Sequence, residues 1–153
     1  MASATVEWLE EYRYLIDHVR AALDWAFSPF GDAALGVSLT AAAVPLWFQL
    51  LLVSECCDRV ERALFAQVAN PDPRCEMQLE AALAWSLMQA RGSVEKTRNA
   101  WIAVLRHSEN LGDIDYQLRA LWGLWTGLLN NAQLKEALAI AERFNSRRDF
   151  RRN

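Results

Sequence analysis

Residues 117–144, QLRALWGLWTGLLNNAQLKEALAIAERF, decide the fold. Helix-forming residues dominate this stretch, and its apolar residues recur three and four positions apart on both sides of Asn130 and Asn131. The pattern predicts two helices, over residues 113–129 and 132–148, joined by a turn at the two asparagines. Because so short a turn reverses the chain, the two helices must lie antiparallel.

The chain repeats this helical hairpin with a period of about 40 residues. A shift of 40 places Trp85 on Trp125 and Trp101 on Ala141. A single pair of helices cannot bury its own apolar face, whereas stacked pairs share one continuous core. Small residues, which let two helices approach closely, occur at three of the repeated positions: Ala84, Gly123 and Ala137.

We therefore predict an all-α fold of about seven helices, in which antiparallel pairs stack as a tetratricopeptide-like α-solenoid. A helical-repeat domain is predicted over residues 1–146. It comprises a capping helix at 6–27 and helix pairs at 33–68, 74–111 and 113–148, and a separate basic C-terminal tail is predicted at 147–153. The sequence Asn70-Pro71-Asp72-Pro73 is the clearest turn, and we place a boundary between helix pairs there.

Several local features refine this prediction. Asp32 and Ser93 are predicted N-caps, and Gly112 is predicted to end the helix that Ser93 begins. Ser54 is predicted to cap the helix at 55–68. Pro45 lacks an N–H to donate to Ala41, which predicts a kink or a break in the helix that begins after Asp32. The inward residues are predicted in two helices: Trp8, Tyr12, Leu15, Val19, Ala22 and Ala26 in the first, and Cys57, Val60 and Leu64 in the third.

Composition and charge exclude several classes of protein. Hydrophobic residues make up 53% of the 153 residues and charged residues 23%, which is the balance of a folded domain. A net charge of -3 and a pI near 5.4 provide no overall attraction to nucleic acid. Residues 33–53 carry no charge, but their Gly, Ser, Thr, Pro and Gln predict a buried helix rather than a membrane span. Without a signal peptide at the N-terminus, the cytoplasm is the predicted location.

No set of residues predicts enzyme chemistry. His18 and His107 are distant in sequence and have no nucleophile or metal ligands beside them. There is no phosphate-binding loop, zinc-protease motif or nucleophile elbow. Three cysteines, two of them the adjacent Cys56 and Cys57, form neither a disulfide framework nor a zinc site. We therefore expect a protein that is not an enzyme and needs no cofactor or metal.

The seven tryptophans are the most ambiguous feature. At helical spacing most of them are predicted to lie in the core. Trp122 and Trp125, however, cannot both point inward together with Leu121, Leu124 and Leu128, so this helix is apolar nearly all round. Either neighbours cover it on both sides, or one ring faces a groove. Because tetratricopeptide superhelices bind through the groove formed by their first helices, Arg119, Trp122 and Thr126 are the candidate binding residues.

Three stretches resemble the helical region of large bacterial regulators, which are signal-transduction ATPases with a winged-helix or cyclase domain. They are YRYLIDHVRAALDWAFSPFGD (12–32), ALGVSLTAAAVPLWFQL (34–50) and residues 117–144. In those families a tetratricopeptide-like superhelix senses an inducer or a partner and relays the signal to the ATPase. The chain contains neither the ATPase nor the DNA-binding domain, so the resemblance implies neither activity.

The resemblance implies a regulatory module that binds a protein partner, or a second copy through the exposed last repeat. The alternative is a sensor that binds a small-molecule inducer in a Trp-lined groove. A further alternative is contact with nucleic acid through the run Arg147, Arg148, Arg151 and Arg152, although such a run is more often the solvated end of a last helix.

Overall fold

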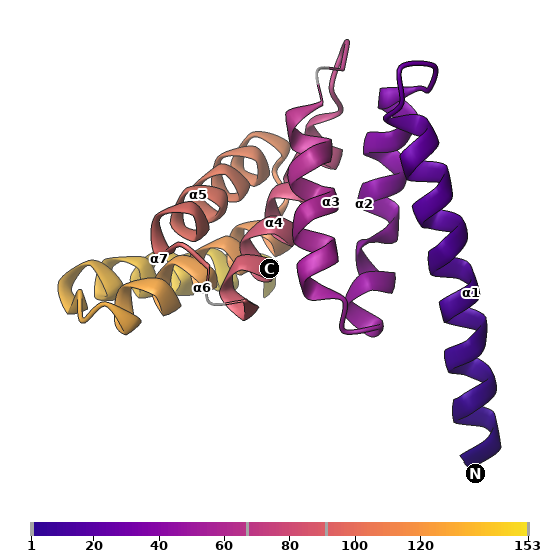
Figure 1. The fold of residues 1–153 in the computed structure, drawn as a ribbon. Coiled ribbons are helices and arrows are strands. Elements are labelled where there is room, and N and C mark those ends of the chain that lie inside the picture. The colour runs from indigo at the N-terminus through magenta and orange to yellow at the C-terminus, as the bar shows by residue number, and fades with distance from the viewer. Residues whose placement is uncertain (1, 67, 91, 153) are drawn as a thin grey trace. The chain divides into compact units, whose positions relative to one another are not determined.

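The computed structural model describes residues 2–66, 68–90 and 92–152, with side chains described between Tyr12 and Arg148. Within these ranges the chain contains seven helices and no strand (Figure 1). The predicted all-α fold of about seven helices is confirmed for this part of the chain. The helices are α1 (Ala2–Ala26), α2 (Ala33–Gln49), α3 (Val53–Phe65), α4 (Pro73–Gln89), α5 (Val94–Leu111), α6 (Ile114–Asn130) and α7 (Leu134–Arg152).

The helix starts follow the period read from the sequence. The even helices α2, α4 and α6 begin at Ala33, Pro73 and Ile114, which are 40 and 41 residues apart. The odd helices α3, α5 and α7 begin at residues 53, 94 and 134, which are 41 and 40 residues apart. Each repeat is therefore one helical hairpin, and α1 precedes the first of them.

The chain forms two compact units, Met1–Pro71 and Asp72–Asn153, which we call the N-terminal and the C-terminal unit. The division falls within the turn predicted to separate helix pairs. In the N-terminal unit α1 packs on α2 and α2 on α3, and in the C-terminal unit α4 to α7 pack in chain order. The division of residues 1–153 into one helical-repeat domain and a tail stays a prediction, and α7 continues through the basic run to Arg152.

Short polar caps fix most of the helix starts. The Asp32 carboxylate accepts hydrogen bonds from the backbone N–H groups of Ala34 (2.9 Å) and Leu35 (3.1 Å). Ser93 caps α5, and Gly112 ends that helix with a left-handed φ of 66°, both as predicted. The predicted Ser54 cap was wrong. Since the chain turns at Leu51 with φ 58°, α3 begins at Val53 and Ser54 lies inside its first turn.

The predicted inward faces of α1 and α3 were also partly wrong. Ile16, Leu23 and Ala26 are buried in α1, while Leu15 is 49% exposed. In α3 the adjacent Cys56 is buried and Cys57 is only half-buried. In α3 the apolar residues form one stripe, and the structure buries Cys56, Val60 and Ala63 along its centre while Cys57 and Leu64 lie at its edge. Trp8 lies outside the residues whose side chains are described.

Pro45 does not break α2, because the helix continues past it to Gln49. Its neighbours Leu46 and Trp47 are buried in the N-terminal unit, and the Trp47 side chain is fully buried. Burial of this apolar turn therefore stabilises the helical conformation where Pro45 removes one backbone hydrogen bond. A break at this position was the wrong alternative.

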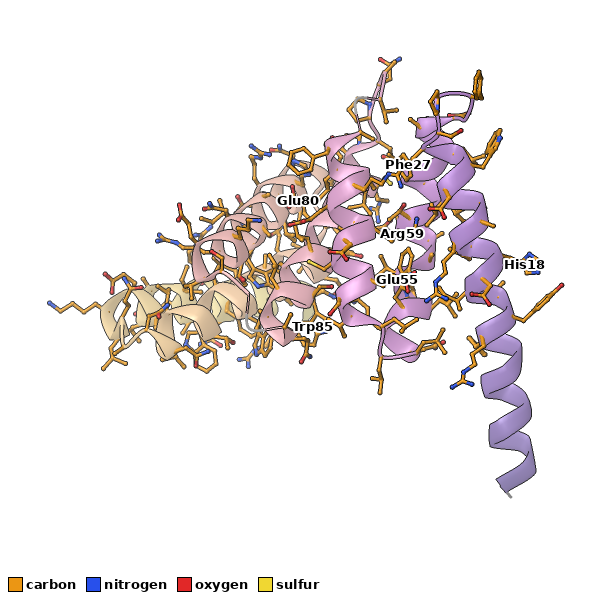
Figure 2. All side chains as sticks on the ribbon, in the orientation of Figure 1. His18, Phe27, Glu55, Arg59, Glu80 and Trp85 are labelled. Atoms are coloured by element: carbon orange, nitrogen blue, oxygen red, sulfur yellow. The ribbon has the colours of Figure 1, made fainter. Side chains whose placement is uncertain are left out.

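A row of polar contacts joins α1 to α3. The Arg20 guanidinium donates to the Glu55 carboxylate at 2.8 Å. One turn further on Arg59 pairs with Asp24, and then Arg62 donates to the Phe27 carbonyl. In all three contacts the residues are 35 apart, as expected for two helices that run in the same direction side by side. In Figure 2 Glu55 and Arg59 extend from α3 on the side of α1.

The core of the C-terminal unit is contributed by all of its helices. Trp101, Val104 and Leu105 of α5 lie at its centre between residues of α4 and α6. Among the described side chains of α7, Ile140 and Phe144 pack against this cluster, and both remain partly exposed. The small residues predicted at close helix approaches are buried: Ala84, Gly123 and Ala137.

Candidate functional site

The tryptophans with described side chains divide into two groups. Trp47 and Trp101 are buried, whereas Trp25, Trp85, Trp122 and Trp125 are at least 36% exposed. The prediction that most of them lie in the core was therefore wrong. The physical reason is that α6 has more apolar circumference than its neighbours cover, so the rings on its outer side remain accessible.

Three of these rings form an exposed surface on the C-terminal unit, which we call the aromatic face: Trp85, Trp122 and Trp125. The Trp85 ring on α4 lies 5.7 Å from the Trp122 ring on α6, with a tilt of 35° between the planes. Such an offset aromatic pair is attractive beyond its buried area. Through this contact the even helices α4 and α6 touch each other. Trp85 is labelled in Figure 2.

A pocket of about 190 Å³ opens beside this face, between α6 and α7. Leu121, Trp122 and Trp125 line it from α6, and Ala141, Phe144 and Asn145 line it from α7. Its wall is therefore almost entirely apolar, with the Asn145 amide as its one polar side chain. Concave apolar surfaces that contain few polar groups are typical of binding sites.

Of the three predicted groove residues only Trp122 lines this pocket. The Arg119 guanidinium lies 4.9 Å from the ring centre of Tyr116, in a cation–π contact within α6. The Thr126 hydroxyl donates to the Trp122 carbonyl at 2.9 Å. All three residues lie on the outer side of α6. The side chains of Arg119 and Thr126, however, make their contacts within this helix. The α7 residues of the pocket were not predicted individually, because the sequence predicted only that the last repeat is exposed.

The odd helices of the C-terminal unit are joined by charge. Glu109 of α5 lies 3.3 Å from Arg143 and 3.6 Å from Arg147 of α7. Arg147 belongs to the basic run for which nucleic-acid contact was the alternative. Its contact with Glu109 favours a structural role, in which it holds α7 against α5.

One carboxylate in this unit is in an unfavourable environment. Glu80 on α4 is half-buried, and desolvation raises the pKa of its carboxyl group above the ordinary value. Arg106 acts in the opposite direction, while the neighbouring carboxylate of Glu76 raises the pKa further.

The described residues show no arrangement that could hold a metal ion through three or more His, Cys, Asp or Glu side chains. His18 stacks edge-on against Tyr14 at 4.3 Å on the surface of α1, and His107 lies beside Arg106 on α5. Burial raises the pKa of the Cys75 thiol, which opposes formation of a reactive thiolate.

Comparison with protein-family models, with curated proteins and with solved structures found no match to this chain. In the ranges described, no helix combines the length and the apolar character that a membrane span requires.

Proposed function

We propose that this chain is a helical-repeat module that binds another protein in the cytoplasm. Its role would be regulatory, like that of the sensor arm in the ATPase-type regulators that it resembles. The observation that supports this proposal is the aromatic face, with its open pocket beside Trp122 and Trp125. Exposed apolar surface of this kind on a folded unit is typical of interaction sites.

The chemistry of the face suits protein binding. Tryptophan is enriched among the residues that contribute most to protein–protein affinity, usually beside a pocket that excludes water. Trp85 and Trp122 are held by two different helices and contact each other, so little conformational freedom remains to be lost on binding. Arg119 lies on the same side of α6 and provides a charge at the edge of the face.

Affinity capture from the native lysate tests the proposal. The wild-type chain, Trp122→Glu and Trp25→Glu serve as three baits. Trp25 is the matched control, because it is 53% exposed on α1 in the other unit. We expect the same protein to be recovered with the wild type and Trp25→Glu and to be lost with Trp122→Glu. Equal recovery with all three baits, or recovery of no protein, would contradict the proposal.

The partner could also be a second copy of the chain, through the exposed surface of α6 and α7. Leu134 and Leu138 on α7 are 67% and 62% exposed, which extends the apolar surface beyond the pocket. Light scattering over a range of concentrations distinguishes this case, since a dimer that Trp122→Glu dissociates would identify the chain itself as the partner.

A small-molecule sensor is the second candidate function, and the pocket is the observation that favours it. Two indoles, a phenyl ring and one amide could hold a small planar inducer. The fluorescence of Trp122 and Trp125 would change when such a ligand enters. A metabolite that shifts the emission of the wild type but not of Trp122→Phe/Trp125→Phe would support this function over protein binding.

A further inference from the structure

We propose that the pocket between α6 and α7 is the binding site for an amphipathic helix of a partner protein. This helix inserts one bulky apolar side chain beside Ala141 and carries acidic residues next to it. The inference rests on the proposed function and specifies the chemistry of the partner. We call the site, formed by Leu121, Trp122, Trp125, Ala141, Phe144 and Asn145, the helix seat.

The preceding helix pair shows what covers an equivalent surface. On α5 the buried stripe consists of Ala100, Trp101, Val104, Leu105 and Ser108, and α6 packs on α5. Since α5 and α7 begin 40 residues apart, this stripe corresponds on α7 to Ile140, Ala141, Phe144, Asn145 and Arg148. All five α7 residues are half-buried or exposed. A helix that packs on α7 as α6 packs on α5 would cover the stripe.

Residue size indicates what the covering helix must supply. On α5 the Trp101 indole fills the space above Gly123 of α6, where even a Cβ atom would overlap the ring. On α7 the corresponding residue is Ala141. Its methyl group is much smaller than an indole, so a pocket of about 190 Å³ stays open beside it. An apolar cavity of about 150 Å³ accommodates a benzene molecule. The covering helix therefore needs a large side chain where α6 has glycine.

Charge favours an acidic helix. The described part of the hairpin, residues 114–148, carries more cations than anions, although the whole chain has a net charge of -3. The cations are Arg119, Lys135, Arg143, Arg147 and Arg148, and the anions are Asp115, Glu136 and Glu142. Glu109 of α5, which contacts Arg143 and Arg147, reduces the excess to one positive charge. Complementary charge selects partners and speeds their association. Acidic residues beside the bulky anchor would meet this excess.

Two synthetic peptides test the inference, both based on residues 113–130, because α6 is the helix that covers the equivalent stripe on α5. Both peptides carry Trp122→Glu and Trp125→Glu, which makes the outer side acidic and leaves the fluorescence to the protein. One keeps Gly123, and the anchor peptide carries Gly123→Leu in addition. We expect the wild-type chain to bind the anchor peptide at least tenfold more tightly than the glycine peptide.

The variant Ala141→Trp is expected to reverse this order. Its indole would fill the pocket as Trp101 fills the space above Gly123, so only the glycine peptide would fit. Ala141→Leu is a smaller change that is included in case Ala141→Trp does not fold. It should weaken binding of the anchor peptide without making the glycine peptide the tighter binder. Circular dichroism and the unfolding midpoint establish that each variant is folded. Replacing the two introduced glutamates of the anchor peptide by lysines should weaken its binding several-fold at low salt.

Equal binding of the two peptides to the wild type, absence of binding, or an unchanged order in Ala141→Trp would overturn the helix seat. Binding of free indole at the pocket by a chain that binds neither peptide would also overturn it, in favour of a small ligand. If the peptides fail while Trp122→Glu still abolishes capture of a protein, the proposed function stands and the helix seat does not.

Discussion

The indole of Trp101 lies directly over the α-carbon of Gly123, so that α5 and α6 meet where one residue has no side chain. The Trp101 N–H also points to the Met88 sulfur at 3.2 Å, which fixes the ring between α4 and α6. Three helices of the C-terminal unit are thus held at one point. The residue at the same position one repeat later is Ala141, which lines the open pocket between α6 and α7.

Substitution of Gly123 by alanine should destabilise the chain by about 1–3 kcal/mol, since the added methyl group overlaps the Trp101 ring and forces the helices apart. Gly127→Ala is the matched control on the same helix, because no atom lies within 4 Å of its added Cβ. It should stabilise the chain by about 0.5–1 kcal/mol through lower backbone entropy. Urea unfolding followed by circular dichroism measures both, and equal effects would argue against the close contact.

The start of α6 depends on Asp113, which accepts from the Tyr116 N–H at 3.1 Å and lies 3.3 Å from Arg74. Asp113→Ala should cost about 1 kcal/mol, because the cap is lost. Asp113→Asn retains a capping oxygen and should recover most of that stability. If the two variants were equally destabilised, the ion pair with Arg74 would be the more important contact.

The ion pair between Arg20 and Glu55 predicts a dependence of stability on pH. The hydrogen bond from Arg20 holds the pKa of the Glu55 carboxyl group below its unfolded value of about 4.5. A lowered folded-state pKa means that the contribution is present above the unfolded pKa and is lost as the pH falls through the folded pKa. Glu55→Gln should therefore cost about 1 kcal/mol at pH 7 and much less at pH 3.

Unfolding in urea at pH 7 and pH 3 measures this difference. Asp58→Asn is the control, because Asp58 is an exposed carboxylate on the same helix. A cost for Glu55→Gln that is as large at pH 3 as at pH 7 would show that the amide disturbs packing rather than charge.

Glu80 predicts the opposite sign. Its carboxyl group has a raised pKa because of desolvation, so ionisation is less favourable in the folded chain than in the unfolded one. Stability is then lost as the pH rises from below the unfolded pKa through the folded pKa. Glu80→Gln should stabilise the chain at pH 7, by up to about 1 kcal/mol, and have little effect near pH 3.

Thermal unfolding at the two pH values measures the effect, with the exposed Glu142→Gln as control. A glutamine variant that is less stable than the wild type at pH 7 would contradict the unfavourable environment of Glu80 and would point to a stabilising contact with Arg106.

The local elements of this fold were determined by the sequence alone. The period near 40 residues, the number of helices and the ends at Asp32, Ser93 and Gly112 follow from residues close in the chain. Caps and left-handed helix ends depend on a few neighbouring backbone groups, so they can be read without knowledge of the packing. Ser54 failed as a cap because the turn at Leu51 brought the helix start forward.

Only the tertiary structure decided which tryptophans are accessible and where the pocket lies. Trp122 on the nearly all-apolar α6 is 40% exposed, whereas Trp101 on the more polar α5 is 3% exposed. A helix that is apolar nearly all round does not specify its buried side, because the neighbouring helices select it. The pocket arises from a size difference between Trp101 and Ala141 across one repeat. That difference is informative only once the structure shows that α6 covers Trp101, whereas Ala141 lines an open pocket.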